Sequence, residues 1–173
     1  MSIELGNPKS VASEQNGPAN FHWLVPGLLG GCPRPGATRN IQRDYEALQR
    51  VDTRLLVTLT QEWQADKVQL ATYGIESFFA PIPDFHPPTL KQADLICERA
   101  LAFTLAGQAV VFHCHAGKGR TGTLLAAMLI YAGLDSQSAI RQTRSQNPSW
   151  IETESQLDFL EAFARHRRSP LGH

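Results

Sequence analysis

AVVFHCHAGKGRTG, residues 109–122, is an apolar β-type run followed by a glycine-containing loop and the beginning of a helix. Ala109–Cys114 predicts a buried strand, and the apolar residues after the loop predict a helix as far as Ala132, where Gly133 ends it. In such a unit the backbone N–H groups of the loop point inward, and the helix N-terminus adds a partial positive charge. The segment therefore predicts an α/β fold with a phosphate-binding loop between a strand and a helix N-terminus.

A nucleophile and a cation are placed around this loop. Cys114 lies at the floor of the predicted anion site, where the positive field favours the thiolate, the nucleophilic form of cysteine. Arg120 follows six positions later, so its guanidinium can fold back and hold two phosphate oxygens, a geometry that lysine cannot provide. Thr121 can donate its hydroxyl to the sulfur, so we predict Cys114, Arg120 and Thr121 as catalytic residues.

His113 is predicted to support the loop by hydrogen bonds to its backbone. The predicted phosphate-binding positions are His115, Ala116, Gly117, Lys118, Gly119 and Arg120.

A phosphoryl transfer through cysteine also needs an acid that protonates the departing oxygen. Asp84 lies in the segment IPDFHPP, a proline-stiffened loop after the predicted strand 75–82. Because the carboxyl ends of adjacent parallel strands share one edge of a sheet, Asp84 and Cys114 can converge there. Glu62 and Asp66 are alternative carboxylates, but they follow a different strand and are predicted to be solvated. We therefore predict Asp84 as the catalytic acid.

Strand-like and helix-like segments alternate along the rest of the chain. The predicted strands are a short pair or bend at residues 21–31 and the runs at 55–60, 75–82 and 109–114. The predicted helices span 38–50, 89–106 after a capping box at Thr89 and Gln92, the segment that ends at Ala132, 136–145, and a last helix that begins within 149–153. This alternation predicts a central, mostly parallel sheet of four to five strands flanked by helices.

The composition is that of a neutral, soluble, single globular domain. The 173 residues carry 16 Lys and Arg against 16 Asp and Glu, and 42% of them are hydrophobic. A protein that depends on bulk attraction to nucleic acid or to an anionic membrane would carry a basic excess, so we expect no nucleic-acid partner. The apolar runs are too short to cross a bilayer, and the N-terminus lacks the pattern of a secretory signal, so we expect no membrane insertion. The predicted organisation is a flexible N-terminal tail at 1–20, a catalytic domain at 21–168 and a C-terminal tail at 169–173.

The cysteines indicate a reducing compartment. Cys32, Cys97 and Cys114 are odd in number and include no CxxC pair, so neither a disulfide framework nor a zinc site is expected. We therefore predict a cytoplasmic location.

HCHAGKGRTG is similar to the His-Cys-x5-Arg-(Ser/Thr) signature of the cysteine-dependent protein tyrosine and dual-specificity phosphatases. The segments NFHWLVPGLLGG, LVTLTQE, PIPDFHPPTL and SWIETESQ also resemble their counterparts in small atypical dual-specificity phosphatases, so that the resemblance covers residues 20–165. It implies that Cys114 attacks phosphorus and forms a phosphocysteine, while Arg120 and the loop amides hold the transition-state oxygens. It further implies that Asp84 acts first as acid and then as base for water, and that no metal ion or other cofactor is needed.

The resemblance leaves the substrate open. The leading hypothesis is a phosphatase of phosphotyrosine in proteins, with phosphoserine and phosphothreonine as further substrates, since the short domain has no obvious insertion that would deepen the pocket. The alternative is a phosphoinositide or inositol phosphate phosphatase. AGKGRTG, with Lys118 inside the loop, is similar to the loop of the tensin-type lipid phosphatases, which usually carry a second lysine where His115 stands here. A phosphate-binding pseudophosphatase is disfavoured because nucleophile, arginine and acid are all present.

Three further assignments concern side chains outside the loop. Gln156 resembles the glutamine that positions water in some of these enzymes, but it also forms a capping box with the threonine three residues earlier. A protective disulfide between Cys97 and Cys114 is possible in this enzyme class, and spacing alone does not show it. Arg141 and Arg144 are predicted to form one solvated helix face.

Overall fold

The fold is a five-stranded sheet with helices on both faces. The computed structural model describes residues 4–169. Its strands are β1 (His22–Val25), β2 (Leu29–Pro33), β3 (Thr53–Thr58), β4 (Glu76–Phe79) and β5 (Ala109–Cys114). Its helices are the short η1 (Glu14–Asn16) followed by α1 (Ile41–Arg50), α2 (Lys67–Thr72), α3 (Leu90–Leu105), α4 (Gly119–Tyr131), α5 (Ser136–Gln146) and α6 (Glu154–Arg168). None of the helices in this part of the chain is long and apolar enough to cross a membrane.

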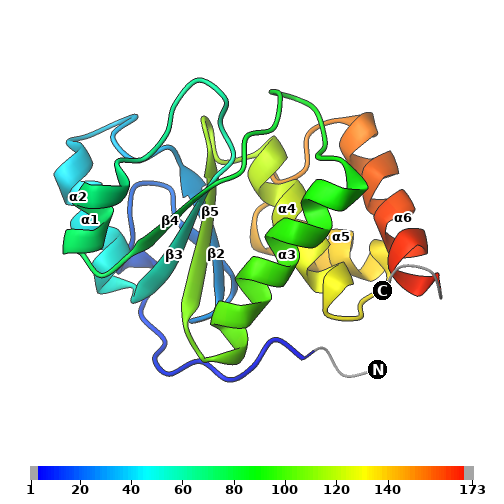
Figure 1. Cartoon of the computed structure of the whole chain (residues 1–173), viewed down its shortest axis with the longest axis horizontal. Coiled ribbons are helices and arrows are strands. Elements are labelled where there is room, and N and C mark those ends of the chain that lie inside the picture. The colour runs from blue at the N-terminus through cyan, green and yellow to red at the C-terminus, as the bar shows by residue number, and fades with distance from the viewer. Residues whose placement is uncertain (1–3, 170–173) are drawn as a thin grey trace.

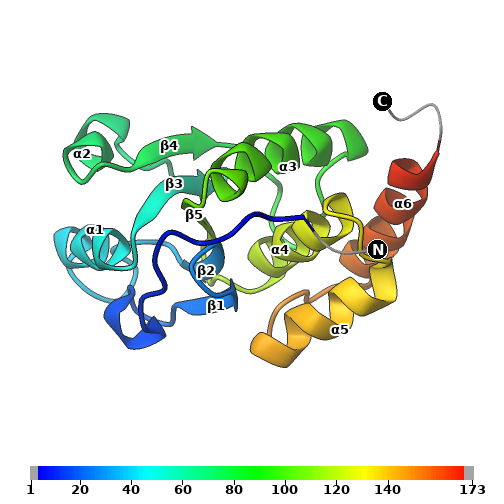
Figure 2. The ribbon, with the colours of Figure 1, turned by 90° about the horizontal axis from the view of Figure 1, so that it is seen from below.

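The strand order β1-β2-β5-β3-β4 puts β5 in the middle of the sheet. The β2, β3, β4 and β5 strands pair in parallel, and β1 pairs antiparallel with β2 at one edge. Figure 1 shows α1 and α2 on one side of the sheet and α3, α4, α5 and α6 on the other, and the view in Figure 2 agrees. This arrangement confirms the predicted α/β fold with a mostly parallel sheet, and a loop between β5 and α4 occupies the predicted place.

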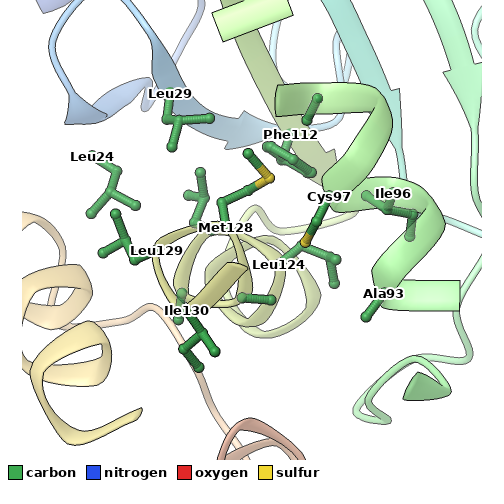
Figure 3. Packing of buried hydrophobic residues seen from close by; sticks show 14 of the residues in the cluster. Leu24, Leu29, Ala93, Ile96, Cys97, Phe112, Leu124, Met128, Leu129 and Ile130 are labelled. Carbon is green, nitrogen blue, oxygen red and sulfur yellow. The ribbon is translucent and has the colours of Figure 1, made fainter. Parts of the chain in front are cut away.

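Two apolar cores cover the two faces of the sheet. Phe112 of β5 packs in the core toward α3–α6, and its neighbour Val111 packs in the core toward α1 and α2. Because β5 is buried on both faces, its sequence is continuously apolar rather than alternating. Helix α4 is buried almost throughout, and Figure 3 shows its Met128 and Leu124 beside Phe112 and Cys97. The packing of α4 against β5 fixes the helix N-terminus next to the carboxyl end of that strand.

The elements differ from the sequence predictions at three points. Helix α2 was not predicted, because its six residues are too few to show a helical period. The β4 strand covers only part of the predicted run 75–82. At the start of α3 the Thr89 hydroxyl accepts a hydrogen bond from the amide of Gln92 (3.0 Å), but the Gln92 side chain donates to the carbonyl of Pro81 (2.9 Å). The predicted capping box there is therefore only half formed.

Much of the predicted N-terminal tail contacts the body of the domain. Residues 4–20 run along the lower edge of the sheet in Figure 1. Leu5 is buried in the larger core, and the indole Nε1 of Trp23 donates to the carbonyl of Ala12 (2.9 Å). The polar composition of this segment indicated mobility and gave no sign of these contacts. The predicted C-terminal tail lies outside the described residues except for Ser169, and the boundaries 21–168 stay a prediction.

Candidate active site

The loop from His115 to Lys118 joins β5 to α4 at the edge of the sheet where the parallel strands end. Gly117 has a positive φ of 69°, and a Cβ at this position would lie 2.5 Å from the backbone N of Pro33. The Gly117 carbonyl accepts a hydrogen bond from the indole Nε1 of Trp150 (3.0 Å). Only glycine fits this turn without a clash, so packing against β2 and the indole fixes the shape of the loop.

The N-terminus of α4 opens toward this loop. Lys118 is the N-cap residue, and within residues 4–169 its side chain makes no capping hydrogen bond to the first turn. The N–H groups of a first helical turn have no partner inside the helix and carry a partial positive charge. Along the loop the side chains of His115, Ala116 and Lys118 are exposed, whereas Gly117 and Gly119 are buried. The predicted phosphate-binding residues thus form one continuous turn that can present backbone donors to an oxyanion.

Cys114 and Thr121 lie together at the base of the loop. The Thr121 hydroxyl donates a hydrogen bond to Sγ of Cys114 over 3.1 Å. Cys114 is only 3% exposed at the end of β5, and Thr121 belongs to the first turn of α4. A hydroxyl donor at this distance stabilises negative charge on sulfur both before and after a nucleophilic attack.

The guanidinium of Arg120 is buried between the loops that follow β3 and β4. It is 2% exposed and donates through Nη1 to the carbonyl of Ile82 (3.1 Å). Its Nη2 lies 3.2 Å from Oδ1 of Asp84 and 3.9 Å from Oε1 of Glu62. The Asp84 side chain is 60% exposed. The structure therefore brings Asp84 and Arg120 together, with the carboxylate between the buried cation and solvent.

The two alternative carboxylates have different surroundings. Asp66 accepts hydrogen bonds from the amides of Val68 and Gln69 and caps α2. Glu62 is solvated as predicted, with 54% of its side chain exposed, but its Oε1 also lies 3.9 Å from Nη2 of Arg120. The signal that could have placed it is its position in the loop that follows β3 (Thr53–Thr58), whose carboxyl end is paired with that of β5. Glu62 is therefore a site residue that the sequence interpretation undervalued.

His113 is buried directly before Cys114. Its Nε2 lies 2.7 Å from the hydroxyl of Thr58, and its Nδ1 lies 3.4 Å from the carbonyl of Cys114. The ring of Trp63 packs edge-on against it, with 5.5 Å between ring centroids. Burial lowers the pKa of His113 to about 3, so the imidazole is neutral at physiological pH and cannot supply a positive charge to the loop.

The predicted phosphate-binding loop, His115–Lys118, is called the phosphate loop below. A segment far along the chain, Trp150–Glu152, supports it, and we call this segment the brace. Besides the contact of the Trp150 indole, the amide of Ile151 donates to the carbonyl of Lys118 (3.3 Å). A Cβ at Gly122 would lie 2.5 Å from Cβ of Trp150, so α4 and the brace are in direct contact. Ile151 has a positive φ of 67°, a conformation that a β-branched residue adopts only when its surroundings impose it.

Arg144 holds the brace from α5. Its Nη2 donates to the carbonyl of Ile151 (2.7 Å), and its Nε donates to the carbonyl of Trp150 (3.2 Å). Arg141 is exposed and donates to the hydroxyl of Ser138 (3.0 Å). The prediction of a shared solvated face is therefore wrong for Arg144, because two carbonyls of the brace turn toward α5 and satisfy its guanidinium.

Gln156 forms a complete capping box at the start of α6. Its Oε1 accepts from the amide of Thr153 (3.1 Å), and its own amide donates to the Thr153 hydroxyl (3.2 Å). Its Nε2 is buried without a hydrogen-bond partner among the described residues, and a Cβ at Gly119 would lie 3.0 Å from it. Oε1 of Glu152, which the sequence interpretation missed, would lie 2.7 Å from the same Cβ. The capping interpretation therefore holds, and the remaining amide nitrogen lies against the first residue of α4.

The other two cysteines form no disulfide with Cys114. All three cysteines are free, so the structure contains no disulfide between Cys97 and Cys114. Burial raises the pKa of the Cys32 and Cys97 thiols, which makes them poor nucleophiles. Cys32 packs in the core toward α1 and α2, whereas Cys114 packs in the core on the other face of the sheet. Within the described part of the chain, no group of three or more His, Cys, Asp or Glu side chains is placed to hold a metal ion.

The burial of neutral His113 predicts acid sensitivity of the fold. The pKa of this group is 6.5 when unperturbed and about 3 in the folded protein, so the unfolded chain binds more protons between these values. The free energy of unfolding therefore falls as the pH drops below 6.5, and this group contributes about 2 kcal/mol of the loss between pH 7 and pH 5. Urea unfolding at the two pH values should show a loss smaller by that amount in His113→Asn, but not in His115→Asn, whose side chain is exposed. An equal loss in wild type and His113→Asn would contradict this assignment.

The contacts of Arg144 predict a distant effect on anion binding. Arg144→Gln should weaken the binding of inorganic phosphate by about tenfold, because small displacements of binding groups are costly. Arg141→Gln removes the same charge from the same helix without touching the brace, and it should change the affinity by less than about twofold. Isothermal titration calorimetry measures both. Equal affinities in the two variants would mean that Arg144 does not shape the loop.

Known proteins resemble this chain in sequence and in fold. The Arabidopsis thaliana protein named phosphatidylinositol 3,4,5-trisphosphate 3-phosphatase and protein-tyrosine-phosphatase PTEN1 is 37% identical over 95 residues, which is 51% of this chain but only 22% of the plant protein. The human phosphatidylglycerophosphatase and protein-tyrosine phosphatase 1 is 28% identical over 154 residues, covering 83% of this chain and 72% of the human protein. The crystal structure of Tk-PTP in the active form superposes with a TM-score of 0.75 at 26% identity, over 85% of this chain and 97% of Tk-PTP.

A family model provides the most direct assignment. The model of the polymorphic toxin system DSP-PTPase phosphatases matches residues 30–134, which is more than half of the chain. The matched region begins in β2 and extends beyond α4, so it contains Asp84, Cys114 and Arg120. On this match, on the phosphate loop and on the fold shared with Tk-PTP, the chain belongs to the DSP-PTPase family of cysteine-based phosphatases.

Proposed function

We propose that this phosphatase removes phosphate from phosphotyrosine in proteins, and also from phosphoserine and phosphothreonine, through a phosphocysteine on Cys114. The observation that carries the proposal is the contact of 3.2 Å between Nη2 of Arg120 and Oδ1 of Asp84. It places the proposed acid beside the cation that would hold the phosphate. Asp84 and Arg120 lie at the same edge of the sheet as Cys114, the last residue of β5.

In the proposed first step the Cys114 thiolate attacks phosphorus while the bond from phosphorus to the leaving oxygen breaks. Protonated Asp84 gives its proton to that oxygen, so the alcohol or phenol departs neutral. The Nε of Arg120 is buried without a partner among the described residues, so it is available to a phosphate oxygen. Backbone N–H groups of the loop would bind the remaining oxygens.

In the proposed second step the Asp84 carboxylate takes a proton from a water molecule. The water oxygen bonds to phosphorus as the bond between phosphorus and sulfur breaks, and inorganic phosphate leaves. The sulfur departs as a thiolate, which the Thr121 hydroxyl stabilises at 3.1 Å. The buried Nε2 of Gln156, which lies against Gly119, is a suitable donor to orient that water.

The open rim of the site supports an aryl phosphate as substrate. Phe85 follows the proposed acid and is 57% exposed, so its ring can pack against a substrate ring. Such an aromatic pair contributes about 0.5–1.5 kcal/mol beyond the burial of its surface. Because Asp84 is also exposed, a shallow site of this kind can admit the shorter side chains of phosphoserine and phosphothreonine.

A lipid substrate is the second candidate, and two observations favour it. Lys118 is exposed on the rim of the loop, where it can pair with an additional phosphate group. The names of the plant and human relatives include phosphatidylinositol trisphosphate and phosphatidylglycerophosphate, respectively. Both names also include protein-tyrosine phosphatase, so they support either class of substrate.

Release of inorganic phosphate from a substrate panel tests the proposal. The panel contains phosphotyrosine, phosphoserine and phosphothreonine peptides, phosphatidylglycerophosphate and phosphoinositides in mixed micelles, and soluble inositol phosphates. We expect the highest kcat/KM on phosphotyrosine peptides, no turnover by Cys114→Ser, and a loss of about fivefold on phosphotyrosine in Phe85→Ala. A higher kcat/KM on either lipid than on every peptide would replace the protein substrate with the lipid. Turnover by Cys114→Ser at the wild-type rate would contradict the proposed nucleophile.

A further inference from the structure

We propose that Thr153 is a positioning residue of this phosphatase: its hydroxyl fastens the loop of Asp84 to the N-terminus of α6. The hydroxyl donates a hydrogen bond to the carbonyl of Phe85 over 3.0 Å, and we call this bond the clasp. The inference rests on the proposed function, because it gives Thr153 a role only if Asp84 is the acid. Nothing in the sequence indicates the clasp, since its two residues are 68 positions apart.

The hydrogen bonds around Thr153 fix the direction of its proton. Its oxygen accepts from the amide of Gln156 at 3.2 Å and lies 3.1 Å from the hydroxyl of Ser155. The Phe85 carbonyl can only accept, so the Thr153 proton is directed toward it while Ser155 donates to the Thr153 oxygen. One hydroxyl thereby caps α6 and at the same time holds the segment Asp84–His86, which we call the acid loop.

The acid loop has few other attachments. Within residues 4–169, the polar contacts that tie Asp84–His86 to the rest of the fold come from Arg120 and Thr153. Phe85 has a positive φ of 62°, which is unfavourable for a bulky side chain and needs an external hold. A bound phosphate would compete with Asp84 for the guanidinium of Arg120. With substrate in the loop, the clasp is therefore the contact that keeps Asp84 over the leaving oxygen.

Helix α6 is a firm anchor for the clasp. Its Phe159, Leu160 and Phe163 are buried in the core between the sheet and α3–α6. The start of α6 and the loop between β4 and α3 both lie at the top of the view in Figure 1. Thr153 also follows the brace directly, and the brace holds the carbonyls of Gly117 and Lys118. One short segment therefore sets the position of the acid loop relative to the phosphate loop.

The experiment compares kcat/KM on two aryl phosphates. Phenyl phosphate has a poor leaving group that needs the acid, whereas 2,4-dinitrophenyl phosphate releases a stable anion without protonation. Thr153→Ala should lower kcat/KM on phenyl phosphate by about tenfold and on the dinitrophenyl ester by less than about twofold. Thr153→Ser keeps donor and acceptor and should restore the wild-type ratio of the two rates.

Two more variants separate the clasp from the cap. Thr153→Asp keeps an acceptor for the amide of Gln156 but has no proton to donate to Phe85, so it should show the same selective defect as Thr153→Ala. Asp135→Ala removes the N-cap of α5, where the carboxylate accepts from the amide of Ser138 (2.9 Å), and should leave the ratio of rates unchanged. A wild-type ratio in Thr153→Asp, or equal losses on both esters in Thr153→Ala, would overturn the clasp.

Asp84→Asn distinguishes failure of the clasp from failure of the proposed function. If Asp84 is the acid, this variant loses activity selectively on phenyl phosphate, and adding Thr153→Ala to it causes no further selective loss. A selective loss in Asp84→Asn together with none in Thr153→Ala would remove the clasp and keep the acid. No selective loss in Asp84→Asn would remove the acid assignment itself, and the role of Thr153 with it.

Discussion

A buried positive charge holds together the loops at the edge of the sheet where the proposed active site lies. The guanidinium of Arg120 is 2% exposed, and a buried cation is tolerated only when polar partners replace its water. Those partners are the carbonyl of Ile82 and the carboxylates of Asp84 and Glu62, which come from the loops after β4 and β3. Because the parallel strands end at one edge, the charge holds these loops at the edge of the sheet where β5 ends at Cys114. A bound phosphate dianion would compete with these carboxylates for the guanidinium of Arg120.

The phosphate loop and the acid loop depend on residues that the chain supplies later. The brace contacts the phosphate loop, Arg144 holds the brace from α5, and the Thr153 hydroxyl contacts the acid loop. Much of this support consists of hydrogen bonds to backbone carbonyls. It therefore fixes the path of the backbone and does not depend on which side chains the supported residues carry. Ile151 and Phe85, two residues with an unfavourable positive φ, are also residues whose carbonyls accept these hydrogen bonds.

The loop between β5 and α4 and the approach of Asp84 to it could be predicted from the sequence, whereas the residues that support this loop from elsewhere could not. A continuously apolar strand, a glycine turn and a helix start predict the loop between β5 and α4, and the shared edge of parallel strands predicts that Asp84 approaches it. The inward turn of Arg144 depends on carbonyls in a segment whose conformation includes a left-handed isoleucine, and no local pattern encodes that. The position of Glu62 after β3 indicates the right edge of the sheet, but its distance from Arg120 depends on the path of the loop, which periodicity does not describe.

The central claim is that Cys114 carries the phosphoryl group during turnover. Rapid acid quench of the enzyme mixed with a ³²P-labelled phosphotyrosine peptide, followed by peptide mapping, measures this directly. The label should appear on the peptide that contains Cys114 and should be absent in Cys114→Ser. With ³²P-labelled 2,4-dinitrophenyl phosphate, whose leaving group needs no acid, the label should accumulate in Asp84→Asn, where the proposed base for the second step is lost. Turnover by the wild-type enzyme with no label on Cys114 at any quench time, or with label on another residue, would contradict the claim.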